Sequence, residues 1–215
     1  GLLVATISAG FTLLLDAFTF ALSALLIFTL KPRNQSAPEA ATFIEDLRGG
    51  WREFMRHKWL WTIVLQFSFV VAATEPVFAL IGPAITKSQL GGPISWGIIA
   101  AGMGMGTLTG GLIAINIRVQ RPMFVGSLLI FFLAAVPLLL AVPVSVPMIT
   151  LGAFVAGVAG QVFGVLWYTT LQTEIPSHLL SRVSAYDHLG SIILTPIGIL
   201  ASGFLYEIIG PRQTL

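Results

Sequence analysis

The sequence contains no cysteine and few charged residues. Without a thiol, this chain cannot form a disulfide bond, a thiolate metal site or a cysteine nucleophile. Charged residues make up 9% of the 215 residues, whereas about 25% is usual for a soluble domain. Hydrophobic residues make up 56% of the chain, and the mean hydropathy is +0.92. A soluble fold of this size could not cover so much apolar surface with polar groups, so the composition predicts a membrane protein.

Several function classes have no support in the sequence. Basic runs with interleaved aromatic residues are missing, so we expect no nucleic-acid partner. The sequence also lacks a G-x-S-x-G motif, a phosphate-binding loop and a His/Glu cluster with metal-ligand spacing. We therefore expect no enzymatic activity, and neither catalytic residues, nor a metal site, nor a cofactor.

Six apolar runs are long enough to cross a hydrocarbon core of about 30 Å, which takes about 20 helical residues. Lipid offers the backbone no hydrogen-bond partners, and none of the runs alternates like a barrel strand, so each is expected to be a helix. The sequence thus predicts an all-α polytopic membrane protein. Residues 1–8 are typical of the tail of an earlier span, as expected for a fragment of a longer protein. The six runs fall near 11–30, 59–81, 93–117, 122–142, 146–170 and 189–209.

Lysine and arginine are concentrated in alternate connectors. Nine of the eleven basic residues lie in 31–58, 118–121 and 171–188, whereas only Lys87 and Arg212 lie on the opposite side. Short connectors rich in Lys and Arg stay in the cytoplasm. These three connectors are therefore predicted to be cytoplasmic.

The first of these connectors divides into two parts. Residues 31–40 are rich in proline and polar residues and are typical of a linker. Residues 41–59 predict an amphipathic helix, although Gly49 and Gly50 weaken that prediction. Such a helix could lie on the inner membrane face with its basic residues toward the headgroups, or it could pack on its own protein. Its apolar positions are Phe43, Ile44, Leu47, Trp51, Phe54 and Met55.

Ionisable side chains inside a span are costly and usually face a cavity or a partner. Glu75 lies well inside the second run and is followed by Pro76, which removes a backbone donor and kinks a helix. A carboxyl group in a dry cavity suits reversible proton binding, so Glu75 is the leading candidate for proton coupling and Asp16 the second. Alternatively, Glu75 satisfies the kink and Asp16 is a structural or interfacial hydrogen-bond partner.

Polar and small residues at depth give further candidates. Gln66, Thr74, Met103 and Gln161 are chosen as cavity-lining residues by polarity and depth alone, and they could equally hold helices together. Gly106 and Gly110 form a G-x-x-x-G pattern that permits close helix contact. That contact could serve either sliding helices or static packing.

Three stretches, taken in order, resemble one family of membrane proteins. The stretch LLLDAFTFALSALLIFTL (13–30) resembles the sixth helix of bacterial major facilitator superfamily exporters, in the branch of macrolide-efflux and enterobactin-exporter-like proteins. EDLRGGWREF (45–54) is similar to that branch's central cytoplasmic loop, and LQTEIPSHLLSRVS (171–184) to the loop after its tenth helix. RVQRP (118–122) matches the loop between helices eight and nine only in being basic and brief. The run after the last of these stretches is also similar to the family's P-x-G-x-x-x-x-G helix, through Pro196, Gly198 and Gly203. Matching residues in the three stretches include Asp16, Ala17, Thr19, Phe20, Ser23, Ala24, Leu171, Gln172, Pro176, Arg182, Val183 and Ser184.

The resemblance implies two six-helix bundles built from inverted repeats around a central cavity. Residues 1–30 would be the end of the N-terminal bundle, 31–58 the central cytoplasmic loop, and 59–215 helices seven to eleven with the start of helix twelve. The missing N-terminal helices would then be a partner of this chain within one protein. Cytoplasmic gating contacts break and form in alternating access. The gate candidates are Arg182, with Glu174 or Asp187 as its partner, and Arg118 and Arg121, unless these basic residues are solvated anchors.

The function expected from the sequence is secondary active transport. The resemblance implies a proton-coupled exporter of amphipathic small molecules, such as drugs, macrolides or siderophores, in the bacterial cytoplasmic membrane. The proton gradient would be its energy source, and its partners a small-molecule substrate and the lipid bilayer. A non-transporting membrane scaffold or a degenerate transporter fragment is the alternative.

Overall fold

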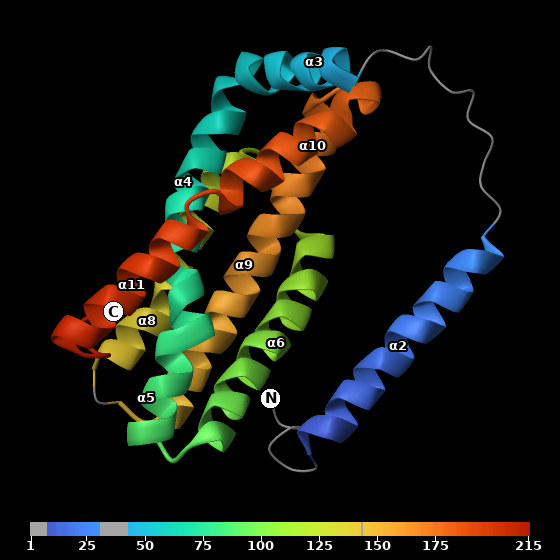
Figure 1. The fold of residues 1–215 in the computed structure, drawn as a ribbon. Helices are drawn as coiled ribbons and strands as arrows, with labels where there is room; N and C mark the ends of the chain where they lie inside the picture. Colours follow the sequence, from blue (N-terminus) through green and yellow to red (C-terminus); the bar gives the residue numbers. More distant parts are fainter. Residues whose placement is uncertain (1–7, 31–42, 143) are drawn as a thin grey trace.

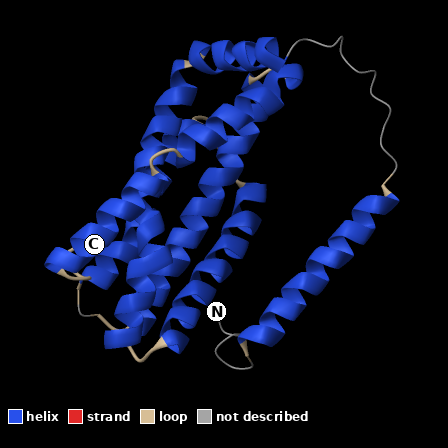
Figure 2. Cartoon of the chain, in the orientation of Figure 1, coloured by secondary structure: helices blue, strands red, loops and turns tan. Residues whose placement is uncertain are grey.

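The described residues, 8–30, 43–142 and 144–215 of a computed structural model, are helices joined by short loops, without a strand (Figures 1 and 2). Residues 1–7 of the expected earlier span and the expected linker at 31–40 lie outside them. The α-helices are α2 (Ala9–Thr29), α3 (Phe43–Arg56), α4 (Lys58–Pro76), α5 (Gly82–Gln89), α6 (Pro93–Asn116), α7 (Pro122–Ile130), α8 (Ala135–Ala141), α9 (Val146–Glu174), α10 (Ser177–Ile192) and α11 (Thr195–Ile209). A π-helical turn, η1 (Val77–Ile81), and a 3-10 turn, η2 (Phe131–Ala134), join neighbouring helices.

Six helical segments in this part of the chain are long and apolar enough to cross a membrane. Each corresponds to one of the six runs expected from hydropathy, which confirms an all-α polytopic membrane fold. Prolines stand in the first turn of α6, α7 and α9, where the missing N–H would have no helical partner in any case. The six segments are Gly10–Thr29, Lys58–Gln89, Pro93–Asn116, Pro122–Ala141, Val146–Glu174 and Ser177–Ile209.

The helices extend further than hydropathy indicated at one connector. Residues 171–188, expected to link two spans, are mostly helical, because α9 continues to Glu174 and α10 already begins at Ser177. The break falls at Pro176, whose ring disfavours helical geometry in the preceding residue. A second break separates α10 from α11 just before Pro196, and Figure 1 shows the turn between them. The last span is therefore a broken helix.

The second span is interrupted directly after Glu75. α4 ends at Pro76 and the π-helical turn η1 follows, in which the Gly82 N–H donates to the Val77 carbonyl. Pro76 has no N–H to donate to the carbonyl one turn earlier, and a short π-helical turn accommodates the resulting change in the hydrogen-bond pattern. The helix then continues through Pro83 as α5, because Pro83 stands in the first turn of that helix. The irregular backbone thus lies within the span rather than at its end.

Glycine allows α6 and α9 to pack with their backbones in contact. A Cβ atom at Gly106 would collide with the Phe154 carbonyl group, and one at Gly157 with the Met103 carbonyl group. A Cβ atom at Gly110 would lie 2.6 Å from the Val158 oxygen. The two helices therefore interlock through glycines on both sides, and Figure 1 shows them lying side by side.

α3 lies across one end of the bundle, at the cytoplasmic side predicted from the basic residues (Figure 1). The helix continues through both glycines, and a Cβ at Gly50 would lie 2.8 Å from the Arg182 Cβ of α10. The Tyr186 hydroxyl donates a 3.0 Å hydrogen bond to the Leu47 carbonyl, and Phe54 is only 5% exposed. Glycine at 50 is thus explained by close contact with α10. One face of α3 packs on its own protein.

A glutamate and a histidine join α3 to α4. His57 Nε2 lies 3.0 Å from Glu53 Oε1, and Arg56 lies 3.6 Å from the other carboxylate oxygen. The hydrogen bond to His57 and the charge of Arg56 hold the pKa of Glu53 below its usual range. Glu53 therefore carries its negative charge beside the arginine at neutral pH.

Candidate transport cavity

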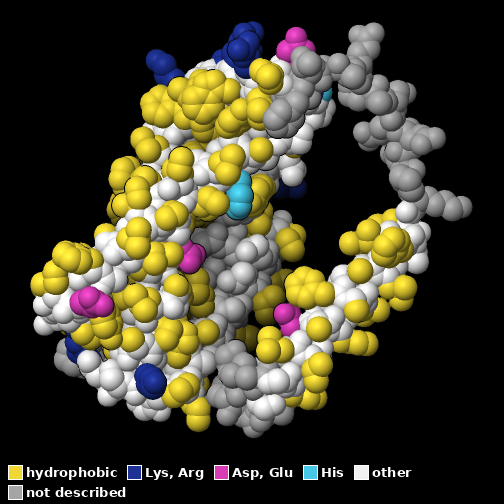
Figure 3. Space-filling view, viewed as in Figure 1, with side chains coloured by type: hydrophobic (Ala, Val, Ile, Leu, Met, Phe, Trp, Pro, Cys, Tyr) yellow, Lys and Arg dark blue, Asp and Glu magenta, His cyan; other side chains and the backbone are white. Residues whose placement is uncertain are grey.

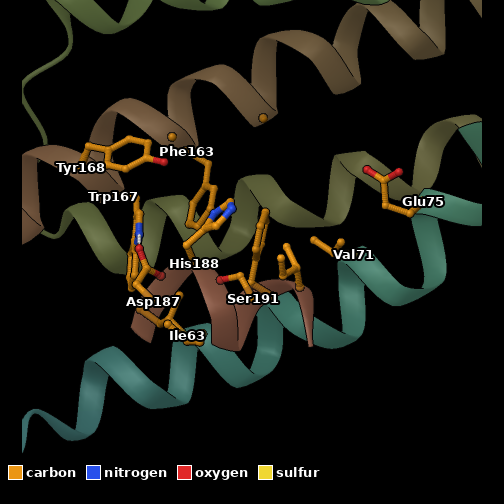
Figure 4. Close-up of a pocket in the computed structure, with 14 residues that line it drawn as sticks. Ile63, Val71, Glu75, Phe163, Trp167, Tyr168, Asp187, His188 and Ser191 are labelled. Carbon is orange, nitrogen blue, oxygen red and sulfur yellow. Dashed lines mark hydrogen bonds between the residues drawn. The ribbon is translucent and has the colours of Figure 1, made fainter. Parts of the chain in front are cut away.

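A cavity of about 360 Å³ opens between α4, α9 and α10. Aromatic rings form much of its wall, and three ionisable side chains lie along it. Figure 4 shows Trp167, Asp187 and His188 gathered toward one end and Glu75 at the other. The lining residues are Ile63, Val64, Phe67, Val71, Glu75, Gly160, Phe163, Gly164, Trp167, Tyr168, Asp187, His188, Ser191 and Ile192.

A buried carboxylate marks one end of the cavity. The Trp167 indole N–H donates a 3.0 Å hydrogen bond to Asp187 Oδ2, and the two residues are 6% and 7% exposed. Trp167 is held in place by Phe163, with ring centroids 6.2 Å apart, and by Trp59 at 5.8 Å. A buried carboxylate needs such a donor, because burial without a partner is costly. Asp187 thus fixes α10 against α9.

The other carboxylate, Glu75, lines this cavity from α4 but is exposed, unlike Asp187 and unlike the dry setting expected from the sequence. It follows Phe67 and Val71 along one helix face, as residues four apart do. Glu75 also lines an adjoining apolar pocket with Thr195 and Pro196 at the start of α11. The Thr195 hydroxyl oxygen in that pocket is buried and has no hydrogen-bond partner among the described residues. Glu75 therefore stands beside the breaks of two spans.

The remaining predicted cavity residues lie elsewhere. Gln66 and Thr74 line a separate pocket of about 310 Å³ against α7 and α8, and the Thr74 hydroxyl donates to the Val70 carbonyl at 2.9 Å. Met103 and Gln161 lie at the contact of α6 with α9, where a Cβ at Gly110 would be 3.0 Å from the Gln161 Cβ. The structure therefore does not bring these four residues together with Glu75. Asp16, on α2, is exposed in the described part of the chain.

The cytoplasmic gate candidates are also separated. Arg182 is half-buried where α10 crosses α3, whereas Glu174 is exposed at the end of α9. Arg118 and Arg121 are exposed in the connector between α6 and α7. Asp187, expected as a local partner of Arg182, instead accepts the hydrogen bond from Trp167 inside the cavity.

Sequence reasoning missed the aromatic wall of this cavity, and it selected Asp187 as a gate residue rather than as a lining residue. Nothing in the local sequence distinguishes Phe163, Trp167 and Ser191 from ordinary core or interfacial residues. One signal was available. Asp187 and His188 stand directly before an apolar run, and ionisable residues so close to a span often face a cavity.

Carboxylates outnumber basic groups around the cavity. Two carboxylates and one histidine line it, and no lysine or arginine is among its lining residues. Aromatic faces and carboxylates both attract cations. The lining is therefore suited to an apolar molecule that carries a positively charged group.

Six span-capable helices with a cavity between three of them define a multi-pass membrane helix bundle. The chain is 25% identical over 228 aligned residues to the uncharacterized MFS-type transporter YvqJ of Bacillus subtilis (strain 168). This alignment covers 100% of the chain and 53% of the relative, so the chain spans about half the length of the curated relative it matches. The chain is therefore similar along its whole length to part of a protein named as an MFS-type transporter, where MFS denotes the major facilitator superfamily. No family model and no solved structure matches the sequence.

The Trp167–Asp187 hydrogen bond makes a testable contribution to stability. Replacing Trp167 by phenylalanine keeps an aromatic ring at this position but removes the indole donor of the buried Asp187 carboxylate, which should cost about 1–3 kcal/mol. The Trp167→Phe protein in detergent should therefore unfold at lower temperature than the wild type. Tyr168→Phe, which changes an exposed neighbour, is the control, and equal unfolding temperatures for all three proteins would contradict the structural role of the bond.

Proposed function

We propose that this chain is the C-terminal half of a secondary active transporter of the major facilitator superfamily, with helix six and the central loop. The transporter exports amphipathic small molecules from bacteria by proton-coupled alternating access. The observation that carries the proposal is a cavity that contains two carboxylates and lies beside two interrupted spans. The similarity to an MFS-type transporter along the whole chain supports it.

Interrupted helices support a transport role for physical reasons. Irregular backbone at membrane depth is tolerated where it is buried or lines a water-filled cavity, and many transporters bind substrates at discontinuous helices. Glu75 stands directly before the π-helical turn, and Thr195 stands at the break between α10 and α11. A change in either break would move the walls on both sides of Glu75.

The lining favours weakly basic amphipathic substrates over anionic ones. Apolar and aromatic walls suit a hydrophobic body, and Asp187 and Glu75 suit a protonated amine. Basic macrolides and cationic dyes fit this description. An iron-chelating siderophore with several negative charges would meet two carboxylates without a compensating lysine or arginine in this half of the cavity.

In this proposal the two carboxylates have different tasks. Asp187 is held by Trp167, so it fixes the inner end of the cavity and faces the substrate cation. Glu75 lies at the other end and exchanges a proton with the external side. The substrate and the proton then compete for the negative charge of one cavity, as antiport requires.

The test uses everted membrane vesicles that contain the intact transporter and are energised by respiration. We expect a cationic dye to accumulate in the vesicles and a protonophore to release it, while an anionic siderophore does not accumulate. Accumulation of the dye that survives collapse of the proton gradient would contradict proton coupling. Failure of every substrate to accumulate would favour the non-transporting scaffold.

A further inference from the structure

α3 carries two exposed stripes of different chemistry side by side. Leu47, Trp51 and Met55 are apolar and remain 43%, 51% and 43% exposed. Arg48, Arg52 and Arg56 follow them at the same four-residue spacing and are also exposed. The six side chains, together with Tyr186, line one shallow groove. Figure 3 shows hydrophobic and basic side chains together at the end of the molecule where α3 lies.

The order of the faces around α3 follows from its contacts. Gly50 and Phe54 face α10. With 3.6 residues in each turn, Trp51 and Met55 come next around the helix, and Arg48 and Arg52 come after them. The apolar stripe therefore borders the buried face, and the arginine stripe borders the apolar one. Because α3 lies across the end of the spans (Figure 1), the apolar stripe points sideways along the membrane surface.

The adjacent apolar and arginine stripes of α3 fit a membrane surface better than they fit bulk water. Three large apolar side chains in a row would be costly in water, but they match the boundary between headgroups and acyl chains. Arginines beside them reach the phosphate level, where a guanidinium group can bind phosphate oxygens through two hydrogen bonds. Glu53 lies 3.6 Å from Arg56 and offsets its charge. Arg48 and Arg52 are therefore the principal cationic groups of the groove.

We propose that the α3 groove binds an anionic phospholipid of the inner leaflet. The acyl chains lie against Leu47, Trp51 and Met55, and the headgroup phosphate lies between Arg48 and Arg52. Charge complementarity favours this occupant, because the described lining residues of the groove include three arginines and no acidic side chain. Through Tyr186, which also lines the groove, the bound lipid supports the contact of α3 with α10, the helix that carries Asp187. This proposal does not depend on the transported substrate.

The test measures phospholipid binding to the intact protein in detergent, with native mass spectrometry as the readout. Phosphatidylglycerol and phosphatidylcholine of equal chain length are the probes. We expect phosphatidylglycerol to bind more tightly, and its affinity to fall about fivefold for each arginine replaced by glutamine at positions 48 and 52. The preference should also weaken as the salt concentration rises.

A matched control distinguishes specific binding of the lipid in the groove from nonspecific attraction of an anionic lipid to basic residues on the surface. Arg118→Gln with Arg121→Gln removes two exposed basic residues from another connector on the same predicted side, and this variant should bind phosphatidylglycerol like the wild type. Equal binding of the two lipids would overturn the proposal, as would an equal loss in both double variants. A dimer that Trp51→Ser abolishes would assign the groove to a second copy instead. If the arginine double variant does not fold, Arg52→Gln alone gives the same comparison.

Discussion

Replacing Glu75 by glutamine is expected to uncouple substrate binding from the proton. In the wild type, substrate affinity should change with pH, because in the proposed antiport a proton on Glu75 and a cationic substrate compete for the same cavity. Coupling between two ligands of one protein usually changes affinity by about 5- to 150-fold. Glutamine keeps the size and polarity of the side chain but cannot ionise, so most of this pH dependence should vanish. Fluorescence titration of a cationic dye at acidic and alkaline pH measures the change.

Two further variants make the result specific to Glu75. Glu207→Gln removes an exposed carboxylate near the end of α11 and should keep the full pH dependence. Asp187→Asn keeps an acceptor for the Trp167 indole and removes the charge at the other end of the cavity. If the pH dependence survives in Glu75→Gln but is lost in Asp187→Asn, the coupling group is Asp187, and Glu75 is only part of the helix break.

Replacing Gly106 by valine should severely destabilise the bundle. A side chain at this position collides with the backbone carbonyl of Phe154, and a backbone atom cannot move aside as a side chain does. Overpacking usually costs about 1–3 kcal/mol, and more where the neighbour cannot yield. We expect Gly106→Val to give little monodisperse protein in size-exclusion chromatography and a lower unfolding temperature in detergent.

Gly104 provides the matched control on the same helix. A Cβ added at Gly104 meets no atom within 4 Å, so Gly104→Val carries the same helix propensity without the collision. It should behave like the wild type. If both valine variants are equally stable, α6 and α9 do not pack as closely as the structure indicates.

Hydropathy predicted the fold because lipid leaves the backbone few choices. Runs of about 20 apolar residues must be helical, and all six runs correspond to span-capable helices. The ends of the helices were harder to predict, because polar residues at a membrane surface can continue a helix as easily as leave it. The interval 171–188 shows this, since it contains charged residues and is still mostly helical.

The candidate site was only partly predictable from the sequence. Glu75 stood out because a carboxylate before a proline inside an apolar run is unusual in any fold. Gln66, Thr74, Met103 and Gln161 were chosen by polarity and depth, but depth does not determine the direction of a side chain around its helix. The Trp167–Asp187 hydrogen bond joins residues from two helices, and local patterns carry no information about such a contact.

The amphipathic segment at residues 41–59 was also only partly predictable from the sequence. Its two alternatives, packing on the protein and lying on the membrane, concern different faces of one helix. Gly50 and Phe54 contact the bundle, whereas Trp51 and Met55 remain exposed. Gly49 and Gly50 weakened the helix prediction because glycine is a poor helix former, and the close approach of α10 at Gly50 explains why glycine is found there.

The measurement that tests the central claim most directly is substrate-driven proton movement. Everted vesicles with the intact transporter are energised, a pH-sensitive dye reports their internal acidity, and a cationic macrolide or dye is then added. The account predicts that protons leave the vesicles on addition of substrate, and that they do not in Glu75→Gln vesicles that still bind it. Transport of the same substrate without any proton movement in the wild type would contradict the account.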